Sequence, residues 1–254
     1  MWNKSLAEIV AENYSYGAVL HQFGIDFFKY PYKTLSSICI SRHISPHLVV
    51  RELELKTQYN KEEVQSLHFA RLAKYPVDMV IDYLKQSHRI FMRHRLPYMK
   101  NLIDHTNLPS VDAPYFEIVN DLKIAFPLFA EDFIHHILEE EAEIFNHIMQ
   151  LDDVVYHKLP ISKMYFAMEK YNIGKFATSH TIDDDDMAGI REMTQDYQIK
   201  TDTPFLLKVL YTELLAFEEE LSQHAAIENQ ILIPKALKLE AAVKKIFQEK
   251  AKLN

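Results

Sequence analysis

The sequence has little of what breaks helices or crosslinks chains. Glycine occurs only 4 times, cysteine once and proline 10 times in 254 residues. With so few interruptions, the long stretches rich in Leu, Ile, Ala, Glu and Lys favour helices over strands. The composition, 48% hydrophobic and 25% charged, is globular and allows a sizeable core. We therefore predict an all-α protein.

Three further absences exclude classes of partner and location. The single cysteine, Cys39, excludes an intramolecular disulfide, which agrees with a reducing compartment. A net charge of -8 gives no general attraction to nucleic acid or anionic lipid. Residues 1–6 lack the apolar core of a signal peptide, and no apolar run is long enough to span a membrane. We expect a soluble, cytoplasmic protein with neither a nucleic-acid nor a membrane partner.

Proline and polar segments divide the chain into three parts. Residues 1–58 predict a small helical N-terminal domain, in which Ser45 precedes a helix that begins at Pro46. Residues 59–75 are polar and predict a connector. Residues 76–254 contain four long helical patterns, separated by breaks near Pro109, Pro160 and Pro204 and followed by a C-terminal helix. This punctuation is typical of an up-down four-helix bundle.

Each of the four patterns has an apolar stripe that polar residues interrupt. Apolar positions three and four residues apart form the face that a helix turns toward a bundle core. The stripes are Val77, Ile81, Leu84, His88 and Phe91; Phe126, Phe133, Ile137, Glu140, Ile144 and Ile148, with His136 one turn before Glu140; Ile173, Phe176, His180, Asp184 and Met187; Leu210, Leu214, Phe217, Leu221, His224, Glu228 and Ile231. Every predicted helix thus directs a histidine inward, at nearly equal intervals along the chain.

These inward polar residues predict a metal site. Burying an imidazole or carboxylate without compensation is costly, and a metal ion supplies that compensation. Residues four apart share a helix face, so His136 with Glu140, and His224 with Glu228, can each present a nitrogen and an oxygen to one centre. A single histidine on an apolar face is more often a hydrogen-bonded core residue. Six donors together, with His88 and His180, favour a dinuclear site with bridging carboxylates.

Two local alternatives remain open. His135 and Glu139 have the same spacing as His136 and Glu140 but leave the stripe, which predicts that they face solvent or lie behind the ligands. In the third helix His180 continues the stripe, whereas Asp184 or Asp185 could replace or join it. The acidic run 183–186 is either a solvated turn or a support for the site.

The same residues resemble a known family, the hemerythrin-like di-iron proteins for repair of iron centres. Residues 224–234, HAAIENQILIP, look like the closing ligand helix of the family, and residues 136–145, HILEEEAEIF, are similar to its second ligand helix. His88 stands eight residues before Leu96-Pro97, where the family places its first histidine. Residues 23–27, FGIDF, and Thr34-Leu35 resemble its small leading domain.

The resemblance implies a cofactor and a task. It implies two non-haem iron ions, oxo- or hydroxo-bridged, in a protein that repairs iron-sulfur or other iron centres damaged by nitrosative or oxidative stress. It could do so by donating iron or through nitric oxide chemistry, with damaged iron-sulfur proteins or diatomic ligands as partners. The sequence departs from the family at Phe28-Lys29, where relatives carry two adjacent cysteines, so a step that uses those thiols is not expected.

Other functions stay open on sequence alone. The bundle could bind or sense oxygen or nitric oxide without turnover, in the manner of hemerythrin. It could also be a helical interaction protein whose histidines are hydrogen-bonded and hold no metal. Manganese or zinc could take the place of iron, since the order of metal affinities does not select iron.

Overall fold

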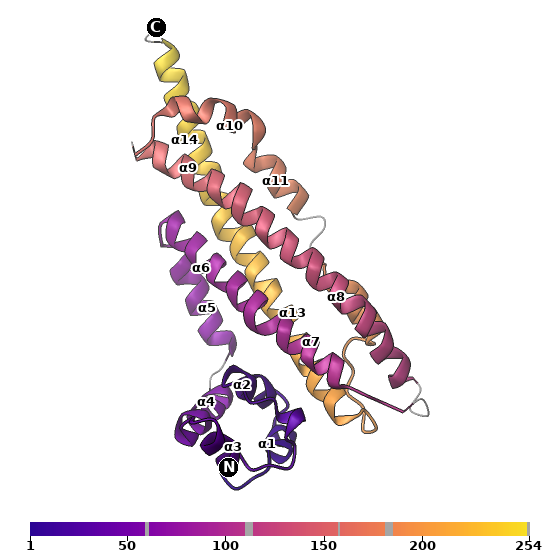
Figure 1. The fold of residues 1–254 in the computed structure, drawn as a ribbon. Helices are drawn as coiled ribbons and strands as arrows, with labels where there is room; N and C mark the ends of the chain where they lie inside the picture. The colour runs from indigo at the N-terminus through magenta and orange to yellow at the C-terminus, as the bar shows by residue number, and fades with distance from the viewer. Residues whose placement is uncertain (59–60, 110–113, 157, 181–184, 253–254) are drawn as a thin grey trace. The chain divides into compact units, whose positions relative to one another are not determined.

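The computed structural model describes the chain apart from residues 59–60, 110–113, 157, 181–184 and 253–254, together with the side chains of residues 58, 61–66 and 178–180. Its elements are all helical, and the described part of the chain contains no strand (Figure 1). The predicted all-α class is therefore confirmed. None of the described helices is both long and apolar enough to cross a membrane.

Residues 1–58 form a group of short helices. They are α1 (Leu6–Glu12), α2 (Tyr16–Gln22), the 3-10 helix η1 (Phe27–Lys29), α3 (Leu35–Ser41) and α4 (Pro46–Gln58). Ser5 and Glu8 cap the start of α1 reciprocally, and Thr34 caps α3. As predicted, α4 begins at Pro46. The only cysteine, Cys39, is buried in α3.

Three long helical runs follow, and each contains a π-helical turn. The runs are α6 (Val77–Ile90), η2 (Phe91–Arg95) and α7 (Leu96–His105); α8 (Tyr115–Glu140), η4 (Glu141–Phe145) and α9 (Asn146–Val155); α13 (Phe205–Ile227), η6 (Glu228–Leu232) and α14 (Ile233–Lys252). Each run ends or begins close to a predicted proline break. The predicted connector contains a helix, α5 (Lys61–Leu72).

The third predicted pattern is not one long helix. It consists of η5 (Ile161–Lys163), α10 (Met164–Lys170), α11 (Ile173–His180) and α12 (Ala188–Met193). The break after α10 has a local cause: the side chain of Asn172 accepts a hydrogen bond from the backbone N–H of Lys175 at 2.9 Å. An asparagine that binds the backbone in this way starts a new helix rather than continuing the old one.

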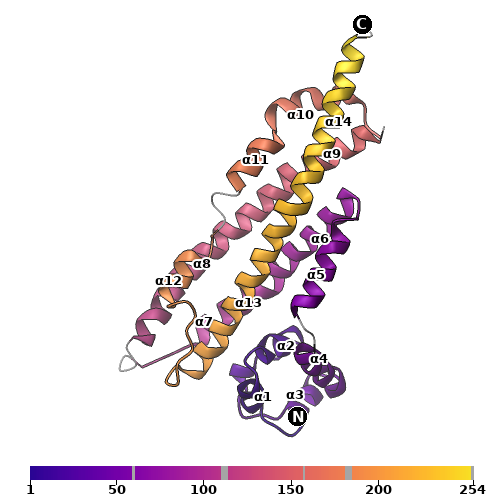
Figure 2. The same cartoon turned by 180° about the vertical axis from the view of Figure 1, so that it is seen from behind.

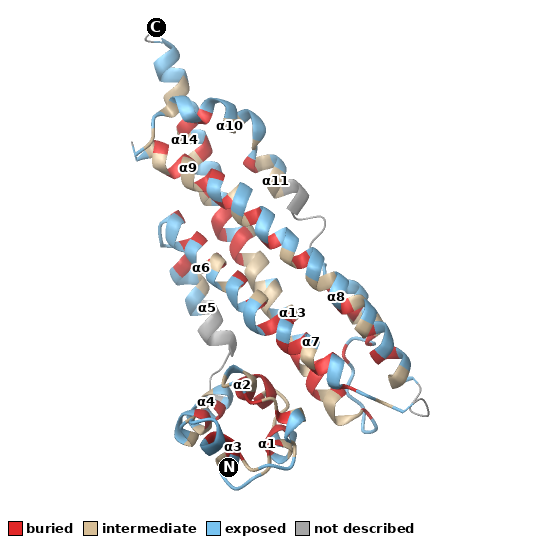
Figure 3. Ribbon diagram, in the orientation of Figure 1, coloured by how far each residue is buried: buried red, intermediate tan, exposed pale blue. Residues whose placement is uncertain are grey.

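Contacts divide the chain into two units. Unit 1 contains residues 1–64, 91–130 and 187–219, and unit 2 contains residues 65–90, 131–186 and 220–254. The domain boundaries predicted from sequence, at 58 and 76, stay a prediction. Within unit 2, α9 and α14 lie side by side in both views (Figures 1 and 2), and α6 packs on α9 and η6. Buried and exposed residues alternate along α9 and α14 (Figure 3), as in helices with one face in a core.

Unit 1 contains a buried polar group that sequence analysis missed. Arg95 donates a hydrogen bond to Glu213 at 2.9 Å, and both side chains are almost fully buried. The hydroxyl of Tyr98 is buried nearby and has no hydrogen-bond partner among the described residues. Burial, and then the charge of Glu213, raise the pKa of Tyr98 well above its usual value. The ring of Tyr98 stacks on His21, at 4.6 Å between ring centroids.

Candidate metal centre

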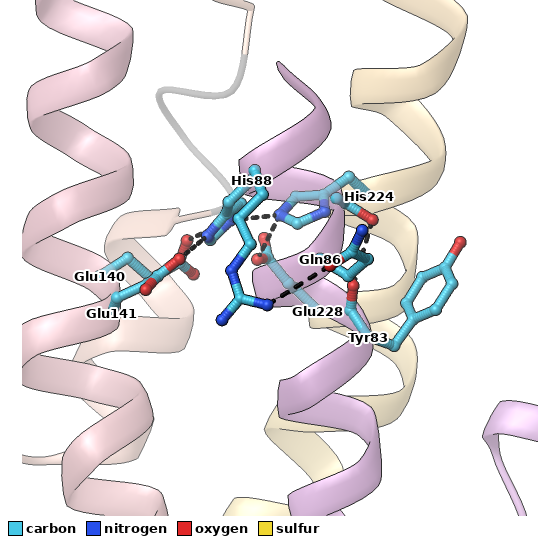
Figure 4. A network of polar contacts seen from close by, with 9 residues as sticks. Tyr83, Gln86, His88, Glu140, Glu141, His224 and Glu228 are labelled. Atoms are coloured by element: carbon cyan, nitrogen blue, oxygen red, sulfur yellow. Dashed lines mark hydrogen bonds and ion pairs between the residues drawn. The ribbon is translucent and has the colours of Figure 1, made fainter. Parts of the chain in front are cut away.

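Four side chains from three helical runs converge in unit 2 (Figure 4). His88 lies near the end of α6, Glu140 is the last residue of α8, His224 belongs to α13, and Glu228 is the first residue of η6. One donor atom from each side chain lies within 4.8 Å of all the others. Residues separated by more than a hundred positions in the chain thus meet at one point in the core.

The ring nitrogens and carboxylate oxygens face one another closely. The two Nε2 atoms of His88 and His224 are 2.9 Å apart. Oε2 of Glu140 lies 3.5 Å from Nε2 of His88, and Oε1 of Glu228 lies 2.9 Å from Nε2 of His224. The group therefore presents two imidazole nitrogens and two carboxylate oxygens to a common centre.

Burial, aided by neighbouring charges for His88 and Glu140, disfavours the charged forms of His88, His224 and Glu140. His88, Glu140 and Glu228 are only 1%, 5% and 3% exposed. Burial, and then the nearby His224, lower the pKa of His88 to about 4, while burial lowers the pKa of His224 to about 4. Burial, and then the charge of Glu228, raise the pKa of Glu140 well above its usual value. Both imidazoles are thus neutral at pH 7, the form that binds metal.

The donor set fits a metal ion. Around one ion, with bonds of 2.0 to 2.2 Å, donor atoms are at most about 4.4 Å apart. The four donor atoms all lie within 4.8 Å of one another, which is close to that limit. A bound cation would also offset the cost of burying two carboxylates. Within the described part of the chain, this buried group could hold a metal ion.

Each of the three π-helical turns in the described part of the chain begins within three residues, along the chain, of a converging side chain. Glu228 opens η6, Glu140 directly precedes η4, and His88 stands three residues before η2. Fewer than about 1% of residues in globular proteins are π-helical, and such turns occur frequently at functional sites. Three of the converging residues therefore lie in, or within three residues of, a π-helical turn. This supports a functional site at the cluster, independently of the residue types found there.

His136 departs from the prediction, because its side chain is exposed. The core position on this turn of α8 belongs to the next residue, Ile137, which is buried. His136 therefore lies at the edge of the predicted stripe rather than on it. It is still near enough for its charge to contribute to the lowered pKa of His88. The pair His135 and Glu139 is exposed and forms a surface ion pair at 3.4 Å.

The third-helix candidates are not among the four converging residues. His180 is the last residue of α11, and its side chain lies outside the described part of the structure. Asp184 also lies outside the described residues, whereas Asp185 is described and exposed. The choice among these three residues therefore stays open.

Glu141 is a residue of this site that sequence analysis missed. Its Oε1 lies 2.8 Å from Nδ1 of His88, on the side of the ring opposite the donor cluster (Figure 4). Helical periodicity could not find it, because consecutive residues of an α-helix point about 100° apart and Glu140 already occupied the inward position. The acidic run Glu139-Glu140-Glu141 was the only trace of it in the sequence.

No protein-family model and no curated protein matches this chain. The resemblance to the iron-centre repair family therefore depends on the motif residues themselves.

Proposed function

We propose that this chain is an iron protein that takes part in repairing iron-sulfur or other iron centres after nitrosative or oxidative damage. The observation that supports it most is the convergence of two histidines and two glutamates, from three helical runs, in the core of unit 2. Mixed imidazole and carboxylate donors suit iron, manganese and zinc. The motif resemblance favours iron among these metals.

The proposed architecture is a hemerythrin-like up-down four-helix bundle with a small helical N-terminal domain. In it His88, Glu140, His224 and Glu228 would hold iron, with the two carboxylates available to both ions of a pair. The further donors proposed from the sequence are His136 and one of His180, Asp184 and Asp185. Non-haem iron with an open coordination position can bind a diatomic molecule such as nitric oxide.

The residues around the centre would control access and protonation. Phe145, whose ring stacks on His88, and Leu84 and Ile231, one turn from His88 and three residues from Glu228, are buried in the core of unit 2 and would limit the entry of water. Exclusion of water strengthens the attraction between a bound cation and the two carboxylates. Burial also keeps His88 and His224 deprotonated and ready to bind.

The first test is iron content after anaerobic reconstitution, with Mössbauer spectra, for the original protein and for His224→Ala/Glu228→Ala. The matched control is His135→Ala/Glu139→Ala, because that pair has the same composition and spacing but is exposed. We expect about two irons per chain with coupled signals in the original and in the control, and loss of iron in the cluster variant. One iron per chain would contradict the dinuclear centre, and none in the original would contradict the iron protein.

The second test addresses the task. A [4Fe–4S] enzyme inactivated by nitric oxide is incubated with iron-loaded protein, and recovery of its activity is followed. Recovery with the original and with the exposed-pair control, but not with the cluster variant, is expected. Reversible binding of nitric oxide without recovery would instead favour a hemerythrin-like binding or sensing protein.

A further inference from the structure

The imidazole of His88 is held from two sides by one π-helical turn. Oε1 of Glu141 lies 2.8 Å from its Nδ1 atom, and the ring of Phe145 stacks parallel to it, with an interplanar angle of 5° and centroids 5.7 Å apart. Glu141 and Phe145 are the first and last residues of η4. The ring is 1% exposed, so solvent offers no competing partner.

This arrangement assigns different tasks to two consecutive glutamates. Glu140 approaches the Nε2 side of the ring at 3.5 Å, whereas Glu141 contacts its Nδ1 side. The side chain of Glu140 is 4% exposed, and that of Glu141 is 28% exposed. Glu141 does not belong to the group of four donors that face one another. Its position is behind the histidine, away from the centre.

A carboxylate behind a histidine has a known physical effect. A carboxylate only accepts hydrogen bonds, so Nδ1 of His88 must carry the hydrogen, and Nε2 keeps its lone pair. The Nε2 atom is the one that lies 2.9 Å from Nε2 of His224. Such a partner fixes the tautomer and the direction of a metal-binding imidazole and makes it a better donor.

We propose that Glu141 is a positioning residue of the metal centre, which holds His88 as the Nδ1–H tautomer and aims its Nε2 lone pair at the ion. The inference rests on the proposed metal site, and it adds to that site a residue that is not a ligand. Phe145 completes the support by fixing the plane of the ring.

The experiment compares Glu141→Ala and Glu141→Gln with the matched controls Glu139→Ala and Glu139→Gln. Glu139 is two residues earlier in the same run, and it is exposed. Ferrous iron alone is titrated anaerobically into each protein. In parallel, long-range ¹H–¹⁵N spectra of the metal-free proteins report the tautomer of His88, assigned with a His88→Gln variant. Circular dichroism checks that each variant folds.

We expect Glu141→Ala to bind iron about 10- to 100-fold more weakly than the original, the range for losing such a partner. Glu141→Gln should recover most of the affinity, because its amide oxygen still accepts from Nδ1–H. The spectra should show the Nδ1–H tautomer in the original and in Glu141→Gln, and a mixture in Glu141→Ala. Both Glu139 variants should resemble the original in iron affinity and tautomer.

The outcomes separate this inference from the proposed function. If the original binds iron and Glu141→Ala binds it equally well, the role of Glu141 is wrong and the metal site stands. If the original binds no iron, the metal site fails and the role of Glu141 fails with it. If Glu141→Ala does not fold, the tautomer decides: an Nε2–H form of His88 in the original contradicts the inference.

Discussion

Each unit of the chain buries a polar group, and the two groups are stabilised in different ways. In unit 1, Arg95 and Glu213 have opposite charges and form a direct ion pair. In unit 2, His224 disfavours the charged form of His88, and Glu228 disfavours the charged form of Glu140. The first group supplies its own compensation. The second is a group of histidines and glutamates that could hold a metal ion, and a bound cation would supply its compensation.

The largest expected effect comes from breaking the pair in unit 1. Arg95→Ala leaves the carboxylate of Glu213 buried without its partner, which should destabilise the protein by about 3–5 kcal/mol. Replacing both residues, as in Arg95→Met/Glu213→Leu, should cost much less, because no buried charge remains. Urea unfolding followed by circular dichroism measures both. A loss below about 1 kcal/mol for Arg95→Ala would show that the pair is not a structural element.

The corresponding experiment in unit 2 should give the opposite pattern. Without metal, His224→Leu/Glu228→Leu should be at least as stable as the original. The variant removes a buried imidazole and a buried carboxylate, whose burial is costly when no cation is bound. With free ferrous iron at about 100 times the dissociation constant, the original should gain about 2.7 kcal/mol and the variant nothing. Thermal unfolding with and without iron measures the difference. A large loss of stability in the metal-free variant would mean that the cluster stabilises itself, like the pair in unit 1.

A third experiment tests how tightly unit 1 packs around its polar group. A methyl group on Gly17 would overlap the hydroxyl of Tyr98, so Gly17→Ala should cost about 1–3 kcal/mol. Gly189→Ala in α12 is the control. Apart from the adjoining backbone, no described atom lies within 4 Å of a Cβ added there, and alanine should be neutral or stabilising.

Tyr98→Phe sharpens this test, because it removes the hydroxyl that the methyl group of Gly17→Ala would overlap. Since that hydroxyl has no hydrogen-bond partner among the described residues, Tyr98→Phe alone should cost little. The double variant should recover most of the stability lost in Gly17→Ala. An unchanged loss would place the conflict elsewhere, at Phe27 or Val209.

The smallest expected effect concerns a buried histidine that does not belong to the proposed metal centre. His147 in α9 is buried, and neither ring nitrogen has a hydrogen-bond partner among the described residues. Burial lowers its pKa, and the charge of Glu240 opposes that shift only in part. As the pH falls below 6.5, the unfolded chain therefore binds a proton that the folded chain does not, and stability falls.

His147→Phe should make the loss of stability between pH 7 and pH 5 shallower, while it keeps the ring contact with Tyr171. Thermal unfolding across this range measures it, with the exposed His135→Gln as control. An unchanged slope would show that His147 takes up its proton in the folded chain at the same pH as in the unfolded chain.

The sequence predicted three of the four long helical patterns and the four converging residues of the site, because both depend on local periodicity. Stripes read at 3.6 residues per turn led to His88, Glu140, His224 and Glu228, which the structure brings together. The same rule failed within η4. It predicted Ile144 as the next core residue, but Phe145 is fully buried and Ile144 only partly so. A π-helical turn contains an extra residue and shifts the inward face by one position, and no residue type announces it.

Helical periodicity cannot predict which residues pair when they are far apart in the sequence. Arg95 and Glu213 are 118 positions apart, and nothing in either local pattern indicates that they meet. Glu141 was hidden for a related reason, since its partner His88 belongs to another helical run. Local spacing can therefore nominate the residues on an inward face, whereas the packing of helices decides which of them touch.

The burial of Cys39 has a practical consequence for work on this protein. Burial raises the pKa of its thiol, so in the folded chain the sulfur is both covered and protonated. Thiol reagents attack the thiolate, and this chain has no other cysteine. The rate at which an alkylating reagent labels the native protein thus reports how often the helices around α3 open. Alkylation of Cys39 therefore measures the opening of the N-terminal helices without an engineered label.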